Sequence, residues 1–471
     1  MEFLISFIWL SFALVLGKLL RNWISIFRKL FIPASILGGF FLLFISPGVL
    51  GKLTNGFNIL PEFAVGIWSS FPGFLINVIF ACLFLGKKIP KLKEVWKKAG
   101  PQIIFGHIIA WGQYLFGFLV TLLVLIPLFK VEPMFGALIE IGFIGGHGTA
   151  AGLGQTFNDV GWHQGQELAL GVATVGILLG VISGIFLINW GVKKGHTKFL
   201  KSETKKDKEI EGASKKQETS ETNLTQEKID NNISKKVVDK IMFKIESIEP
   251  LSFHLAYIGI AIGIGAIFLS IIVWLEKVFL LPLGFPVLFG YIPLFPLAMF
   301  GGIIVEKLHY LFFKGNLDRD LFLKVQGTAL DFLIVSALGS LALNALIGAW
   351  LPLLILIIIG VIWTIVAFLF FAPRILGEYW FERGIGSLGQ SLGVTATGIL
   401  LIKVVDPDSN SPALESFGYK QLLFEPFLGG GLFTALSVPL IFAFGLKLMT
   451  VFVFIIFISF IIVGFVIKKS N

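Results

Sequence analysis

The chain alternates long apolar runs with short polar connections over most of its length. An apolar run of about 20 residues is what a helix needs to cross the roughly 30 Å hydrocarbon core of a bilayer. Eleven runs meet this requirement, near residues 3–20, 30–50, 60–85, 101–129, 166–191, 253–275, 281–305, 326–348, 350–372, 421–446 and 448–467. The pattern predicts an all-α polytopic membrane protein.

Two further apolar stretches, near 137–157 and 384–403, are rich in glycine. Glycine weakens a helix interior by roughly 1 kcal/mol relative to alanine. At membrane depth, irregular backbone is tolerated only where protein buries it or where it lines a wet cavity. We therefore expect both stretches to be re-entrant loops, which dip into the membrane and return on the same side.

Basic residues mark one side of this arrangement. They follow the first, third, fifth and seventh spans and the last one, for example at Lys18, Lys87, Lys193, Lys307 and Lys468. The positive-inside rule then places the N-terminus outside and the C-terminus in the cytoplasm. If either glycine-rich stretch crossed the membrane completely, every later basic cluster would fall on the outer side.

Residues 195–250 interrupt the apolar pattern with a tract rich in Lys, Glu, Ser and Asn. Such a composition predicts a disordered linker, here on the cytoplasmic side. It separates an N-terminal membrane repeat, residues 1–194, from a C-terminal repeat, residues 251–446, and an extra span follows at 447–471. Five spans before the linker give the halves opposite orientations, as two inverted five-span repeats require.

Composition narrows the class of protein further. The chain has 471 residues, of which 56% are apolar and 14% charged, and its mean hydropathy is +0.89. These values exclude an ordinary soluble domain. The net charge of +9 is a topology signal and does not indicate a nucleic-acid partner. No metal-spaced Cys and His cluster or phosphate-binding motif occurs, so neither an enzyme nor a cofactor beyond a coupling ion is expected.

The first glycine-rich stretch contains Gly145, Gly146, His147, Gly148 and Thr149. Broken glycine-rich helices are where transporters place their substrate and ion sites. Glycines let backbone carbonyls approach a cation, and Thr149 adds a hydroxyl oxygen that suits the hard ion Na⁺. His147 can hydrogen-bond a carboxylate, or it can simply brace the loop.

The second stretch offers hydroxyls and an amide in an apolar setting. Its candidate residues are Gly386, Ser387, Gly389, Gln390, Ser391, Gly393, Thr395 and Thr397. Thr395 and Thr397 are hypothetical sodium ligands, together with Thr149 of the first stretch. Thr395-Ala-Thr-Gly also repeats the pattern of Thr149-Ala-Ala-Gly. The alternative interpretation is close helix packing by small residues.

Three single residues are weaker candidates. Asp331 is a carboxylate within an apolar span, where ionisable groups mark functional sites by default. Arg383 is the cation nearest to a glycine-rich stretch and a candidate partner for a carboxylate. Asn77 is a candidate for lining the site.

These residues resemble a known family, the bacterial sodium/glutamate symporters. The run Gly145-Gly-His-Gly-Thr-Ala-Ala is similar to the first signature loop of that family. Further similar positions are Ile32, Pro33, Gly38, Gly39, Glu167, Ala173, Thr174, Val175, Gly176, Gly180, Gly184, Gly386, Gly389, Leu392, Gly393, Thr395, Thr397, Pro426 and Gly429. The resemblance implies two inverted five-span domains, two re-entrant loops that meet near the midplane, and Na⁺-coupled glutamate uptake.

The chain also departs from the family pattern. Ser387 stands where the family has a histidine, the mainly apolar region from Ala435 to Val438 stands where it carries Asp and Asn, and the last span is extra. The resulting hypothesis is a secondary active transporter of the plasma membrane, which takes up glutamate or a related amino acid or carboxylate with sodium by alternating access. Two alternatives remain, a proton-coupled carboxylate exchanger and a membrane-embedded lipid or glycan enzyme.

The expected partners are a small carboxylate or amino acid and the lipid bilayer, and self-association as a homodimer stays open. If the two glycine-rich stretches are re-entrant loops from opposite sides, each reaches about half of the membrane thickness. Their tips, near 146–148 and 389–393, should then lie within about 15 Å of each other.

Overall fold

The computed structural model consists of helices joined by turns and irregular segments over the residues that it describes, which are 1–54, 57–87, 92–199, 249–313 and 317–470. No strand occurs within these ranges. Eleven helical segments there are long and apolar enough to cross a membrane. The prediction of an all-α polytopic membrane protein is confirmed, while most of the predicted linker, 200–248, lies outside the described residues.

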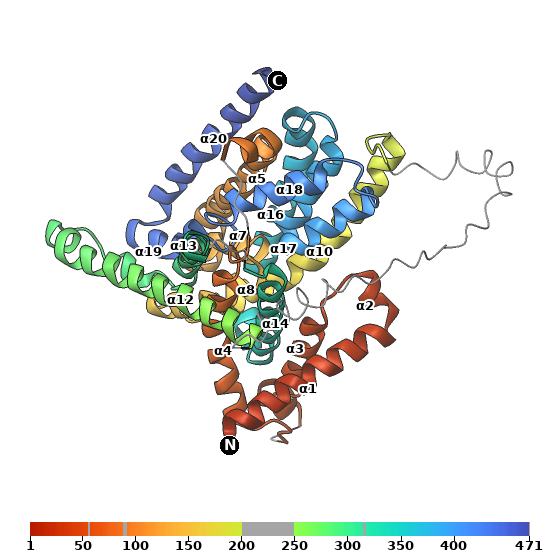
Figure 1. Cartoon of the computed structure of the whole chain (residues 1–471). Helices are drawn as coiled ribbons and strands as arrows, with labels where there is room; N and C mark the ends of the chain where they lie inside the picture. The colour runs from red at the N-terminus through yellow and green to blue at the C-terminus, as the bar shows by residue number, and fades with distance from the viewer. Residues whose placement is uncertain (55–56, 88–91, 200–248, 314–316, 471) are drawn as a thin grey trace, which may run out of the picture.

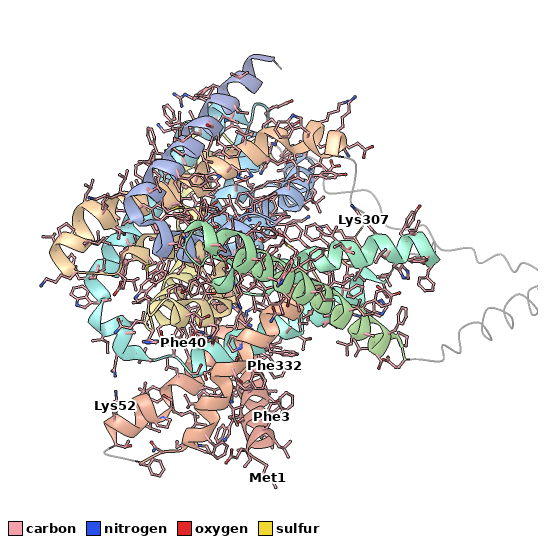
Figure 2. All side chains as sticks on the ribbon, turned by 90° about the vertical axis from the view of Figure 1, so that its left-hand side faces the viewer. Met1, Phe3, Phe40, Lys52, Lys307 and Phe332 are labelled. Carbon is pink, nitrogen blue, oxygen red and sulfur yellow. The ribbon has the colours of Figure 1, made fainter. Side chains whose placement is uncertain are left out.

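One group of helices packs around α4. Its members are α1 (Glu2–Trp23), α3 (Ala34–Phe44), α4 (Glu62–Ala81), α12 (Pro250–Leu275), α13 (Phe295–Phe313) and α14 (Arg319–Gly339). Glycines let these helices touch: a side chain at Gly17 would overlap the backbone of α3, and one at Gly301 would overlap that of α12. Figure 2 shows Met1 and Phe3 at the far end of this group, and the exposed Phe3 suits contact with lipid.

A second group packs around α5 and α10 and contains the middle of the molecule in Figure 1. Its long members are α5 (Leu92–Val120), α10 (Gly165–Lys194), α16 (Trp350–Ile375), α17 (Trp380–Val405) and α20 (Leu446–Ser470). The shorter members are α7 (Leu138–Phe143), α8 (Gly146–Gly152), α9 (Gly154–Asp159), α18 (Ala413–Phe424) and α19 (Leu432–Phe444). Short turns join several of these helices, among them η3 (Pro133–Ala137).

Each group combines helices from before and after the linker. The groups meet where α8 packs on α4 and α14. Gly152 leaves room there for Ile76, since an added Cβ would lie 2.7 Å from its side chain. The glycine-rich α8 therefore makes the largest contact between the two groups, and α13 with α19 adds a smaller one.

The expected single span at 421–446 is wrong. The chain forms α18 and α19 instead, separated by an irregular segment from Glu425 to Gly431. Pro426 lacks a backbone donor, and Gly429 and Gly430 adopt φ values of 69° and 99°, which a continuous helix excludes.

The span expected at 281–305 is shifted, because α13 begins only at Phe295. The extra span at the C-terminal end is present as α20.

Candidate functional site

The first glycine-rich stretch folds back on itself. It runs through η3 and α7, breaks at Ile144–Gly146, and returns through α8 and α9. Gly146 has a φ of 68°, which a glycine adopts without strain. The rings of Phe135 and Trp162, near the two ends of the stretch, lie 6.3 Å apart. Entry and exit are therefore adjacent, and we call residues 133–159 the first hairpin.

The second stretch also reverses direction, although it is long enough to span a membrane. In α17, Gly393 and Val394 have non-helical backbone angles. A Cβ added at Gly398 would lie 2.5 Å from the carbonyl oxygen of Gly386, whereas residues twelve apart in a straight helix are about 18 Å apart. Residues 380–405 thus form two antiparallel arms, which we call the second hairpin, and glycines allow their close approach.

The tips of the two hairpins touch. A side chain at Gly146 would overlap Cγ1 of Val394. The expectation that the tips lie close together is confirmed, and the contact is tighter than expected. Because the hairpins come from different halves of the chain, this contact brings two distant glycine-rich segments into one place.

Helix α10 supports both tips. His147 of the first hairpin bonds Thr174 of α10 through Nε2 at 3.0 Å, so the structure shows the bracing contact for this side chain. At the second tip, a side chain at Gly176 would overlap the carbonyl of Leu392. The hydroxyl of Thr397 donates to the carbonyl of Gly393 within the same hairpin.

A third irregular segment, 425–431 between α18 and α19, meets the first hairpin. The fully buried Glu140 of α7 accepts hydrogen bonds from the backbone N–H of Gly429 at 2.7 Å and from Thr434 Oγ1 at 2.9 Å. It also accepts one from the Tyr114 hydroxyl at 2.5 Å. This break was not expected from the sequence, although Pro426 and the three consecutive glycines 429–431 were a signal for it.

The first arm of the second hairpin is bound to α5 by polar side chains. Gln102 donates to Ser387 Oγ at 3.1 Å, and Gln113 donates to the carbonyl of Ser391 at 2.6 Å. Ser387 and Ser391 are both buried. The Ser387 hydroxyl and the Ser391 backbone carbonyl thus hold the hairpin against α5, whereas the buried Ser391 hydroxyl has no hydrogen-bond partner among the described residues.

Helix α18 lies beside both arms and contributes charged groups that the sequence analysis did not select. Lys420 donates to the side-chain oxygen of Gln390 on the first arm. On the second arm, Thr395 donates to Glu425 Oε1 at 3.2 Å. Gln421 donates to Thr395 at 2.7 Å and to Glu425 at 2.7 Å. The signal was three polar residues in an apolar surrounding, which the assumption of a continuous span had obscured.

The weaker candidates lie away from the tips. Arg383 begins the second hairpin and donates to Gln102 Oε1 at 3.2 Å and to the carbonyl of Leu376 at 2.9 Å. Asp331 is exposed on α14. Asn77 of α4 donates to the carbonyl of Gly73 at 2.7 Å.

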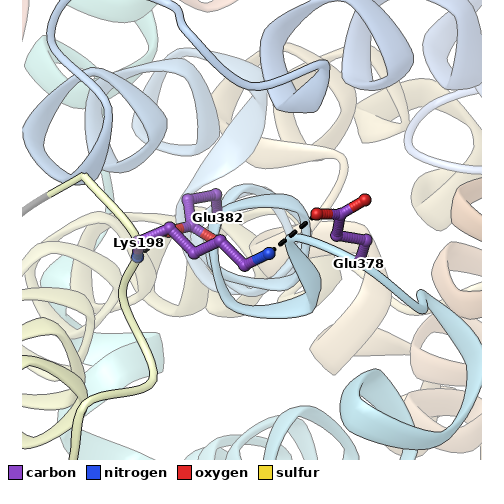
Figure 3. A network of polar contacts seen from close by, with 3 residues as sticks. All are labelled: Lys198, Glu378 and Glu382. Atoms are coloured by element: carbon purple, nitrogen blue, oxygen red, sulfur yellow. Dashed lines mark hydrogen bonds and ion pairs between the residues drawn. The ribbon is translucent and has the colours of Figure 1, made fainter.

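The base of the second hairpin is attached to the chain that leaves α10. The Lys198 ammonium lies 2.8 Å from Glu378 Oε1 (Figure 3), and the backbone N–H of Lys198 also donates to Glu382 at 2.7 Å. The hydrogen bond and charge of Glu378 raise the pKa of Lys198. The hairpin is thus fastened to α10 at its base as well as at its tip.

The chemistry available at the tips is that of oxygen ligands and backbone groups. Within the described ranges, no group of three or more His, Cys, Asp or Glu residues could hold a metal ion. Thr149, whose hydroxyl donates to the Gly145 carbonyl at 3.0 Å, and Thr395 and Thr397 retain oxygen lone pairs for a hard cation. In each hairpin a helical arm begins at the tip: α8 in the first hairpin, and the part of α17 after Val394 in the second. The first backbone N–H groups of these two arms favour an anion at the tips.

Comparison with known proteins gives one family match. Neither the curated proteins nor the solved structures that were compared gave a match. The profile of the sodium/glutamate symporters matches residues 1–407, which include both hairpins and exclude α18 to α20. That family consists of transporters and not of enzymes. Since the match extends over most of the 471 residues, the chain belongs to the sodium/glutamate symporter family.

Proposed function

We propose that this protein takes up glutamate or a related amino acid or carboxylate together with Na⁺ across the plasma membrane by alternating access. The observation that carries the proposal is the contact between the two hairpin tips at Gly146 and Val394. Two broken helices that meet inside a membrane protein create a polar site in an apolar surrounding, as secondary transporters require.

The substrate and the ion would share this site. Backbone N–H groups at the start of the second arms suit a carboxylate. The hydroxyls of Thr149, Thr395 and Thr397, with carbonyls freed at the breaks, suit Na⁺. Gly145, Gly148, Gly386 and Gly389 would contribute close backbone approach rather than side-chain contacts, and His147 would hold the first tip on α10.

The topology follows from the basic loops. In this proposal the hairpins are re-entrant loops from opposite sides, and the two halves are inverted repeats in which α18 and α19 together take the place of the fifth span of the second half. The N-terminus is outside, whereas the linker and the C-terminus are cytoplasmic. The reversals at Gly146 and at Gly393–Val394 support re-entry, because each hairpin returns to the end from which it started.

The moving part would be the second group of helices, which carries both hairpins. Its largest contact with the first group runs through α8, where Gly148 and Gly152 face Ile76 of α4. Small residues at that contact allow the groups to slide against each other with little steric resistance. Such a motion would expose the tips to each side of the membrane in turn.

Uptake by the full chain in proteoliposomes tests the proposal. An inward Na⁺ gradient should drive accumulation of radiolabelled L-glutamate or of another carboxylate in a small panel, and uptake should stop when the Na⁺ gradient is removed. Uptake that follows a proton gradient and ignores Na⁺ would instead support the exchanger. If no panel member is taken up under either gradient, the proposal that the protein transports an amino acid or a carboxylate is contradicted.

A further inference from the structure

Lys420 is a lysine enclosed within the second group of helices. Its exposed fraction is 0%. The ammonium donates to Gln390 of α17 and lies 4.2 Å from the ring centre of Phe424 and 5.5 Å from that of Phe417. A side chain at Gly106 of α5 would overlap Cε of the lysine. The absence of a side chain at that position makes the space that the lysine fills.

Among the described residues, no carboxylate lies within ion-pair distance of the Lys420 ammonium, although the charge of Glu425 acts on it from farther away. Across the part of the chain that the structure describes, the ion pairs are Lys98–Glu415 and Lys198–Glu378. Glu425, on the same side of the second hairpin, receives its hydrogen bonds from Thr395 and Gln421. An amide oxygen and two ring faces compensate an ammonium less well than a carboxylate does. A buried charge in a membrane protein is costly until it is paired.

The position of Lys420 brings this charge close to the tips. Its partner Gln390 lies one helical turn before the break at Gly393. Arg383, the cation that the sequence suggested, lies at the base of the same hairpin and is bound to Gln102 and to the Leu376 carbonyl. The unpaired cation near the tips is thus on α18 and not at the start of α17.

We infer that Lys420 is the cation that binds a carboxylate of the transported anion. The inference rests on the proposed function. In the present arrangement the Gln390 side-chain oxygen is the acceptor for the ammonium. A substrate carboxylate at the tips replaces that oxygen as acceptor, and the Gln390 amide turns away. The exchange turns a weakly compensated buried charge into an ion pair, so an anionic substrate is preferred over a neutral analogue.

Binding to the purified full chain tests this assignment. The dissociation constant for L-glutamate is measured by calorimetry in saturating Na⁺ for wild type, Lys420→Met, Lys420→Arg and Lys98→Met. Lys420→Met should weaken binding about ten- to a hundredfold, as expected for the loss of a charged hydrogen bond. Lys420→Arg should retain most of the affinity. Lys98→Met removes a cation from the exposed pair with Glu415 and should leave binding unchanged.

Two amides identify the carboxylate concerned. L-glutamine and isoglutamine each lack one of the two carboxylates of glutamate. For wild type, one of them should bind more weakly than glutamate, and in Lys420→Met that difference should vanish, as in a double-mutant cycle. Thermal unfolding without ligand checks that each variant folds, and Lys420→Gln replaces Lys420→Met if the latter does not.

The outcomes distinguish failure of the proposed transport function from failure of the role of Lys420. Wild type that binds neither glutamate nor any other carboxylate of the uptake panel contradicts the proposed function, and the role of Lys420 falls with it. Wild type that binds glutamate, with a folded Lys420→Met that binds equally well, overturns the role of Lys420 alone. A Lys420→Met variant in which only the Na⁺ dependence of glutamate binding changes also overturns the role of Lys420, because the lysine would then act on the ion.

Discussion

Val394 occupies the space into which any side chain at Gly146 would extend. Both residues have positive φ values, 68° for Gly146 and 65° for Val394. A β-branched residue in that region of backbone space is strained, and such strain persists only where surrounding structure enforces it. The contact is thus a tightly fitted junction between two helix breaks.

The fit at the tips predicts that Gly146→Ala reduces Na⁺-driven uptake by about tenfold or more, because displacement of a site by 1 Å can cost as much as a hundredfold. Val394→Gly removes the obstructing methyl group. The double variant should therefore recover part of the uptake, although alanine at a positive φ still costs roughly 1 kcal/mol. Equal uptake by Gly146→Ala and wild type in proteoliposomes would show that the tip contact is not required.

Glu140 fastens the first hairpin to the segment between α18 and α19. Its partners Tyr114, Gly429 and Thr434 are all donors toward it. In Glu140→Gln the amide N–H₂ faces at least one of these donors, so one buried hydrogen bond is lost. The substitution should destabilise the protein by about 1–3 kcal/mol. A lower melting temperature in detergent is the expected result, with the exposed Glu132→Gln as control. Coincident melting curves for both variants would contradict the role of Glu140.

The three threonines at the hairpins predict weaker sodium coupling when their oxygens are removed. Thr149→Val, Thr395→Val and Thr397→Val keep the side-chain shape but lose the hydroxyl, so the Na⁺ concentration for half-maximal uptake should rise several-fold. Thr328→Val is the control. Like Thr149 and Thr397, Thr328 donates to the carbonyl four residues earlier, here that of Lys324 at 2.9 Å, but it lies on the exposed face of α14. Unchanged Na⁺ dependence in all three would show that these residues only pack.

Asp406, directly after the second hairpin, predicts a dependence of stability on pH. Burial raises the pKa of its carboxyl, but hydrogen bonds from Ser411 and Asn410 and the charge of Lys403 lower it more, so the pKa lies below the ordinary value of 3.8. The stabilisation is therefore complete above that ordinary value and is lost as the pH falls through the lowered pKa.

The test compares Asp406→Asn with wild type. The variant should melt at a lower temperature near neutral pH, since it loses a charged acceptor for three hydrogen bonds from Asn410 and Ser411. The difference should shrink as the pH falls below the ordinary value of 3.8 and through the lowered pKa of Asp406. Asp408→Asn, at an exposed position in the same loop, is the control. A difference that stays constant with pH would exclude the ionised carboxylate as its cause.

The basic loops predict the orientation of the chain. A cysteine placed at Ser214, which lies outside the described residues, should react with a membrane-impermeant thiol reagent only after the cells are permeabilised. The native Cys82 is buried and should give little background. Ready labelling in intact cells would reverse the topology and with it the sides from which the hairpins enter.

Much of the fold could be predicted from the sequence, because a helix that crosses a membrane satisfies its backbone within one apolar segment. Ten of the runs thus identified helices at or near their observed positions. The glycine-rich stretches were recognised for the same local reason, since glycine removes helix propensity wherever it occurs. Their reversals at Gly146 and Gly393 lie within the stretches that composition indicated.

The contacts that make a site depended on tertiary structure. Glu140 and Gly429 are 289 positions apart in the chain, and no local pattern relates them. Lys420 was overlooked because its importance comes from the space above Gly106 and from Gln390 on a neighbouring helix. The break at 425–431 was missed because apolar residues on both sides favoured one long helix.

Sequence by itself determined which segments are helical and where the helices must break, since both follow from short-range hydrogen bonding and hydrophobicity. The packed fold decided which breaks meet and which charges lie beside them, because those depend on long-range contacts between helices.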